Sequence, residues 1–195
     1  MNQTRKNTAL LLIEFQKTWT DKGLFAWLVR KELRRQNTLR NTISLANKAR
    51  ANDIAVIQAP LILDKSDKFR YSKTPLPARI FGFFKKGSEN AEFSEGIYKK
   101  EDSVIKGRYG FDACLGSNLQ STLSQMGIEY VYLCGFVTDH CVKETTLSLI
   151  DKGLSCKIVS DCTAAMKISA QRQIEQEFDC VSCISTDELF EQLTN

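Results

Sequence analysis

The chain has 195 residues, of which 43% are hydrophobic and 26% charged, and this composition suits one globular domain with a sizeable core. The net charge is +4, too small and too interspersed to indicate a nucleic-acid-binding protein. No apolar run approaches the roughly 20 residues that span a bilayer, so we expect no membrane segment. We treat residues 1–195 as a single domain.

Strand-like and helical patterns alternate along the chain. Short apolar runs predict strands at residues 8–14, 54–59, 103–105, 130–134, 155–159 and 180–184. Apolar residues at helical spacing predict helices at 24–46, 112–126, 142–153, 168–178 and 187–193. This alternation predicts an α/β protein, a three-layer αβα (Rossmann-like) sandwich with a mostly parallel sheet of about six strands.

Residues 61–102 show no sustained period, and a connection this long is usually functional or mobile. They are rich in aromatic residues, so we expect an ordered lid over a site or an oligomer contact, and both remain open. We expect a homo-oligomer, either a dimer or a tetramer. Basic residues also cluster here, and we favour a solvated surface over a site for an anionic ligand. These residues are Lys65, Lys68, Arg70, Lys73, Arg79, Lys85 and Lys86.

Seven cysteines are present, and we expect no signal peptide, so a reducing, cytoplasmic location is the expectation. Cys180 and Cys183 form a C-x-x-C pair, but the chain has one histidine, His140, and a zinc site would lack ligands. We therefore expect the pair to be structural, with no metal and no cofactor.

One stretch, Gly135 to Val142, joins a buried strand to a helix and places Cys141 near the first helical turn. A helix N-terminus favours a thiolate over a thiol, although an isolated cysteine is more often a small buried hydrophobe. Glu14 and Lys106 also stand at the ends of predicted strands. Parallel strands place such ends at one rim of the sheet, so we expect these two residues and Cys141 to converge.

Four segments of the chain resemble the isochorismatase-like cysteine hydrolases, and together they span nearly the whole sequence. They are Leu11 to Gln16, Val104 to Ala113, Gly135 to Val142 and Val159 to Ala165. The resemblance implies an acid–lysine–cysteine triad of Glu14, Lys106 and Cys141. The usual acid is aspartate, so Glu14 is a departure. The resemblance also implies an oxyanion site made by the backbone N–H groups of Val137 and Cys141, with a cis peptide between Phe136 and Val137.

This resemblance favours a hydrolase that cleaves an amide or carbamoyl C–N bond of a small-molecule substrate through a thioester. Lys106 and the helix N-terminus should lower the pKa of the Cys141 thiol. Metal-dependent nicotinamidases of the family carry an aspartate and two histidines, which a chain with one histidine cannot supply. Cys141 argues against the vinyl-ether hydrolases that act on isochorismate, which remain an alternative.

A second alternative is a non-catalytic relative that binds a ligand or partner protein, which the departure at Glu14 motivates. A nucleotide-binding protein is disfavoured because no glycine-rich phosphate loop follows the first strand. In the favoured hydrolase, aromatic side chains should wall an apolar pocket over Cys141. The expected wall consists of Phe15, Trp19 and Phe136 with aromatics from Phe69 to Phe84, and the expected polar contacts are Gln16 and Tyr109.

Overall fold

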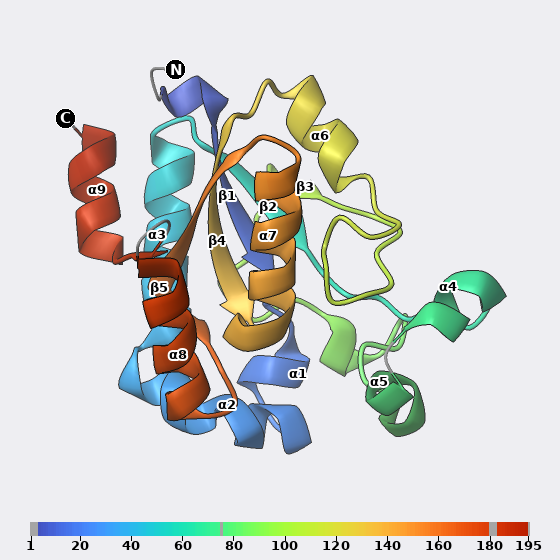
Figure 1. Cartoon of the computed structure of the whole chain (residues 1–195). Helices are drawn as coiled ribbons and strands as arrows, with labels where there is room; N and C mark the ends of the chain where they lie inside the picture. The colour runs from blue at the N-terminus through green and yellow to red at the C-terminus, as the bar shows by residue number, and fades with distance from the viewer. Residues whose placement is uncertain (1–3, 75, 180–182, 195) are drawn as a thin grey trace.

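The computed structural model describes residues 4–74, 76–179 and 183–194, and it shows six parallel strands in the order β3-β2-β1-β4-β5-β6 (Figure 1). The strands are β1 (Thr8–Ile13), β2 (Ala55–Ala59), β3 (Ser103–Val104), β4 (Tyr130–Phe136), β5 (Ser155–Ala164) and β6 (Cys183–Ile184). The predicted α/β class and strand number are confirmed. Of the predicted sixth strand, residues 180–182 lie outside the described part of the chain.

Strand β1 lies at the centre of the sheet, and all six of its residues are buried. Its register pairs Leu11 with Ile57 of β2 and with Leu133 of β4. A strand covered on both faces has no solvent side, which explains why its sequence is an apolar run without alternation.

Helices cover both faces of the sheet and give the three layers (Figure 1). They are α1 (Lys17–Thr20), α2 (Leu24–Arg35), α3 (Thr38–Ala51), α4 (Lys68–Lys73), α5 (Leu76–Phe81), α6 (Leu119–Gln125), α7 (Lys143–Asp151), α8 (Ile168–Asp179) and α9 (Thr186–Thr194). Three short turns, η1 (Arg5–Asn7), η2 (Glu89–Ala91) and η3 (Thr138–Val142), complete the elements. One core layer contains residues of α2, α3 and α9, and the other contains residues of α6, α7 and α8.

Two predicted helices differ from the structure. The long helix from residue 24 is divided at Asn37, whose positive φ of 53° ends one helix and starts the next. The helix predicted from residue 112 begins only at Leu119. Short polar side chains hold the preceding segment in turns, since Asp112 accepts from the Cys114 N–H and Ser117 donates to the Ala113 carbonyl.

The segment 61–102 is ordered where it returns to the body of the protein. Leu63 donates to the carbonyl of Phe84 at 2.7 Å, and Lys86 donates to the carbonyl of Leu63 at 2.9 Å. Between these anchors, α4 and α5 extend away from the sheet (Figure 1). Whether they serve as a lid or as an oligomer contact stays a prediction.

None of the helices in the described ranges combines the length and the apolar character needed to cross a membrane.

Candidate active site

Strands β1 and β4 approach each other closely where the site is built. A Cβ atom on Gly135 would lie 2.1 Å from the backbone oxygen of Ile13, and its φ of 138° is one that other residues rarely adopt. Glu14 follows β1, and the segment after Gly135 leads into η3. Glycine at 135 therefore brings the turn that carries Cys141 against the end of β1.

Cys141 lies in η3, a π-helical turn that continues into α7. The turn closes through the Val142 N–H, which donates to the Val137 carbonyl at 3.2 Å, and the predicted cis peptide between Phe136 and Val137 is present. Single π-turns are rare and often occur at functional sites. Cys141 is buried in the core between the sheet and the helices α6, α7 and α8, and the residue is only 4% exposed.

Glu14 is buried beside the thiol, and both of its carboxylate oxygens are hydrogen-bonded. Arg108 donates from Nη2 to Oε1 at 2.5 Å, and Trp19 donates from its indole nitrogen to Oε2 at 3.0 Å. The backbone of Glu14 has a φ of 56°, an uncommon conformation for a residue with a side chain. These contacts fix the position of the carboxylate.

Arg108 is the residue that the sequence analysis missed. Its guanidinium is buried and also donates to three backbone carbonyls, those of Ala59 at 3.0 Å, Gly110 at 3.1 Å and Phe111 at 2.7 Å. It lies against the Cys141 thiol as well as Glu14. The structure thus joins Glu14 and Cys141 as expected, but the cation that it places with them is Arg108 and not Lys106.

The local backbone explains why Arg108, and not Lys106, lies beside the thiol. Lys106 is held by Asn118, whose side chain accepts from the Lys106 N–H at 2.7 Å, and the Lys106 side chain is exposed. Gly107 then turns the chain with a φ of 89°, so that Arg108 enters the interior. A Cβ atom at 107 would lie 2.6 Å from the Gly116 carbonyl oxygen, so this turn requires glycine.

The pKa of the Cys141 thiol is raised well above its ordinary value, mainly by burial. The negative charge of Glu14 and its hydrogen bond with the thiol raise the pKa further, and Arg108 opposes them. For Arg108, burial lowers the pKa, but its attraction to Glu14 and Cys141 outweighs burial and raises it. The expectation of a lowered thiol pKa is therefore wrong, because desolvation outweighs the nearby positive charges.

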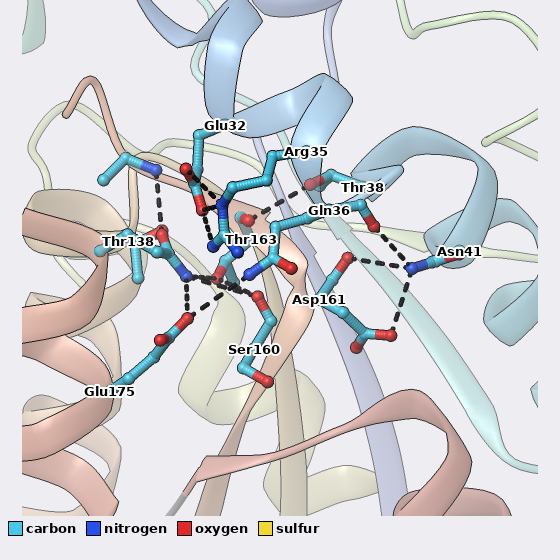
Figure 2. A network of polar contacts seen from close by, with 12 residues as sticks. Glu32, Arg35, Gln36, Thr38, Asn41, Thr138, Ser160, Asp161, Thr163 and Glu175 are labelled. Carbon is cyan, nitrogen blue, oxygen red and sulfur yellow. Dashed lines mark hydrogen bonds and ion pairs between the residues drawn. The ribbon is translucent and has the colours of Figure 1, made fainter. Parts of the chain in front are cut away.

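A buried glutamine of α8, Gln171, supports the turn that carries the thiol. Figure 2 labels three of its hydrogen-bond partners, Thr138, Thr163 and Glu175. The Gln171 side-chain oxygen accepts from the Thr138 hydroxyl at 2.6 Å and from the Ala165 N–H at 3.1 Å. Its nitrogen donates to Glu175 at 3.0 Å and to the Thr163 hydroxyl at 3.3 Å. Gln171 is fully buried, so it fixes the start of η3 against α8 and β5.

The predicted pocket residues have different surroundings. Phe15 and Trp19 pack against Phe136, with ring centroids 4.9 and 5.9 Å apart, and all three are buried. Gln16 is fully buried, and its side chain bonds the backbone of Leu61 and Ala91. These contacts give Gln16 a structural role, while its predicted contact with substrate stays untested.

A cavity of about 500 Å³ lies next to the site and includes Tyr109. Its lining consists of Pro60, Ile62, Leu63, Asp64, Asp67, Arg70, Tyr71, Thr74, Lys86, Val104, Ile105, Lys106, Gly107, Arg108 and Tyr109. Segment 104–109 forms one wall of the cavity and, through Arg108, also reaches the thiol. The cavity therefore shares Arg108 with the surroundings of the Cys141 thiol.

Within the described ranges, no group of three His, Cys, Asp or Glu side chains is arranged to hold a metal ion. His140 is half-exposed, lies 3.4 Å from the Asp139 carboxylate and packs edge-on against Phe111. The charged groups beside the Cys141 thiol are Glu14 and Arg108, and this pair suits nucleophilic chemistry in which a carboxylate receives the thiol proton.

The family model described as the isochorismatase domain matches residues 8–187, so this chain belongs to the isochorismatase family, whose members are hydrolases. The chain is 33% identical over 76 residues to the nicotinamidase/pyrazinamidase of Mycobacterium tuberculosis, covering 39% of each protein. The matches to two curated relatives cover 53% and 39% of the lengths of those proteins, which is about half or less.

Two solved structures show the same fold over nearly the whole chain. A cysteine hydrolase from Pseudomonas syringae pv. phaseolicola 1448A has a TM-score of 0.82 and 16% identity, with coverage of 100% of this chain and 95% of that one. The N-carbamoylsarcosine amidase of Thermoplasma acidophilum has a TM-score of 0.76 and 20% identity, with coverage of 93% and 98%. At these identities the likeness establishes the fold alone.

Proposed function

We propose that this protein is a cysteine hydrolase that cleaves an amide or carbamoyl C–N bond of a small molecule through a thioester on Cys141. The observation that carries the proposal is the shared buried environment of the Cys141 thiol, the Glu14 carboxylate and the Arg108 guanidinium. The names of two relatives, an N-carbamoylsarcosine amidase and a nicotinamidase/pyrazinamidase, support C–N bond cleavage as the class of reaction.

The raised thiol pKa favours proton transfer during attack over a thiolate at rest. In the proposed reaction, the sulfur attacks the carbonyl carbon while Glu14 takes the thiol proton. The tetrahedral oxyanion that results needs backbone donors, and we assign these to the N–H groups of Val137 and Cys141. Glu14 then passes the proton to the leaving amine as the C–N bond breaks, and a thioester remains.

Water completes the cycle. Glu14 accepts a proton from the attacking water, the thioester carbon–sulfur bond breaks, and the proton returns to the sulfur as the acid product leaves. Arg108 stays protonated at all working pH values, so it does not relay protons. Its proposed role is to hold the carboxylate and to stabilise negative charge on sulfur.

The test is ammonia release from a panel of primary amides and carbamoyl compounds, with intact-protein mass spectrometry to detect an acyl adduct. We expect turnover by the parent protein and none by Cys141→Ala. Cys114→Ala is the matched control, because Cys114 is a free, partly buried cysteine outside the site, and it should retain activity. Equal activity in Cys141→Ala would overturn the proposal.

The buried ion pair of Glu14 and Arg108 favours one other function. In that case the protein would be a non-catalytic relative that binds a ligand. Both carboxylate oxygens are already occupied, and the thiol is nearly inaccessible. This function predicts neither ammonia release nor an acyl adduct with any member of the panel.

A further inference from the structure

We propose that the cavity lined by segment 104–109 binds a carboxylate carried by the substrate, and that Lys106 is its charged contact. The inference rests on the hydrolase function proposed above. It adds the class of substrate: amide or carbamoyl compounds that also carry a carboxylate.

The position of the cavity supports this assignment. It lies where the chain leaves β2 and β3, and the carboxyl ends of parallel strands are where α/β sheets bind ligands. Its volume of about 500 Å³ falls within the range of small-molecule sites. Because Gly107 turns the chain between Lys106 and Arg108, one short segment presents a lysine to the cavity and an arginine to the thiol.

The charges of the lining decide which ligand fits. Three of its four cations are paired: Lys86 with Asp64 at 2.7 Å, Arg70 with Asp67 at 3.0 Å, and Arg108 with Glu14 at 2.5 Å. Among the described residues, the Lys106 ammonium forms no ion pair. The cavity therefore holds one unmatched positive charge, which suits a monoanion such as a carboxylate better than a phosphate dianion.

The rest of the lining suits a short organic acid. Tyr71 and Tyr109 bring hydroxyl groups that can donate to a carboxylate, while Pro60, Ile62 and Val104 offer apolar surface to a carbon chain. A few placed polar groups on a mostly apolar wall are typical of small-molecule sites. In this arrangement, the amide of the substrate would lie at the thiol and its carboxylate would pair with Lys106.

The test compares succinamate with butyramide, which have the same four-carbon chain but differ in a carboxylate. We expect Lys106→Met to lower kcat/KM for succinamate by about ten- to a hundredfold, the range for losing a hydrogen bond to a charged group. The effect on butyramide should be at least tenfold smaller, because butyramide carries no carboxylate. Lys100→Met is the matched control, since it removes an exposed lysine outside the cavity lining, and it should change neither rate.

Binding separates this inference from the hydrolase function. Calorimetry on Cys141→Ala should show succinamate binding that Lys106→Met weakens at least tenfold, whether or not the parent protein turns it over. Lys106-dependent binding of succinamate, with no ammonia release from any member of the panel, would leave the site standing and overturn the hydrolase function. Hydrolysis of butyramide by the parent, with succinamate binding and hydrolysis unchanged in Lys106→Met, would leave the hydrolase function standing and overturn the carboxylate site.

Two further outcomes would overturn the role of Lys106. Displacement of succinamate by inorganic phosphate at lower concentration than by acetate would contradict a carboxylate site. Slower alkylation of Cys141 by iodoacetamide in Lys106→Met would place the lysine with the thiol, whereas an unchanged rate is the expected result.

Discussion

Glu14 is held by two donors, and its length matters because both contacts depend on where its carboxylate lies. The side chain receives hydrogen bonds from Arg108 and Trp19, one on each oxygen. Aspartate would withdraw the carboxylate by roughly one C–C bond, about 1.5 Å. Neither donor could follow freely, since Arg108 is also bonded to three backbone carbonyls and Trp19 is stacked between Phe25 and Phe136.

We therefore expect Glu14→Gln to abolish turnover, because an amide cannot take the thiol proton. Glu14→Asp should reduce kcat/KM by on the order of a hundredfold, the cost of misplacing a catalytic group by about 1 Å. Steady-state ammonia release measures both variants. A gain of activity in Glu14→Asp would instead mark Glu14 as the remnant of an aspartate site and would favour the ligand-binding function.

The Glu14–Arg108 ion pair is almost completely buried, with side chains 2% and 1% exposed. Removing one partner of such a pair leaves an uncompensated buried charge, so Arg108→Met should lower the free energy of unfolding by about 3–5 kcal/mol. Glu14→Gln with Arg108→Met should cost less than the sum of the single changes, as measured by urea denaturation. Additive losses would contradict direct coupling between the two residues.

At the scale of single residues, Glu14 and Cys141 could be predicted because each directly follows or closely follows a long buried strand. Arg108 could not, because Lys106 and Arg108 are both cations in one motif and only the backbone distinguishes them. The deciding features are the Asn118 contact, which holds the Lys106 backbone, and the turn at Gly107. The pKa of Cys141 was predicted to be lowered but is raised by burial. The extent of burial depends on the folded core, which the sequence pattern does not show.

At the scale of elements, η3 depends on α8 for its position. Gln171 is the link, because its side-chain oxygen accepts from Thr138 at the start of the turn. Cys141 lies three residues further along the same turn, so Gln171 acts as a positioning residue that does not touch the thiol.

We expect Gln171→Leu to lower kcat while leaving KM nearly unchanged, because the turn shifts but the cavity does not. It should also cost about 1–3 kcal/mol of stability, because the Thr138 hydroxyl and the Ala165 N–H lose a buried acceptor. Gln173→Leu is the matched control on the exposed face of α8, where the Gln173 side chain donates to Glu177 at 2.9 Å. Kinetics well below the unfolding midpoint, with urea denaturation in parallel, test this role. Equal kcat in the two variants would contradict it.

The order of the strands and of the longer helices could be predicted because each of these strands contains a short apolar run and each of these helices has a repeating apolar face. The boundaries that failed are those set by single side chains. Asn37 divides the helical region, and Asp112 and Ser117 hold turns where helix was predicted. A periodic pattern contains no information about such local hydrogen bonds, because they compete with the helix at one residue at a time.

Across the whole molecule, buried thiols make stability sensitive to alkaline pH. Burial raises the pKa of Cys134 and Cys141 well above the ordinary value, and it raises that of Cys114 to about 11 and of Cys156 to about 12. In the unfolded chain these thiols return to a pKa of roughly 8.5. The folded state therefore retains protons that the unfolded state releases above that pH.

Thiol burial consequently contributes its full stability below about pH 8.5, and this contribution falls as the pH rises from there toward the folded pKa values. Each fully buried thiol should account for a loss on the order of 2 kcal/mol between pH 8.5 and 10. Cys134→Ala tests one of them away from the candidate site: it should lower stability at pH 8 but flatten the decline toward pH 10. Urea denaturation under reducing conditions measures both slopes, and identical slopes would show that the alkaline decline arises from other groups.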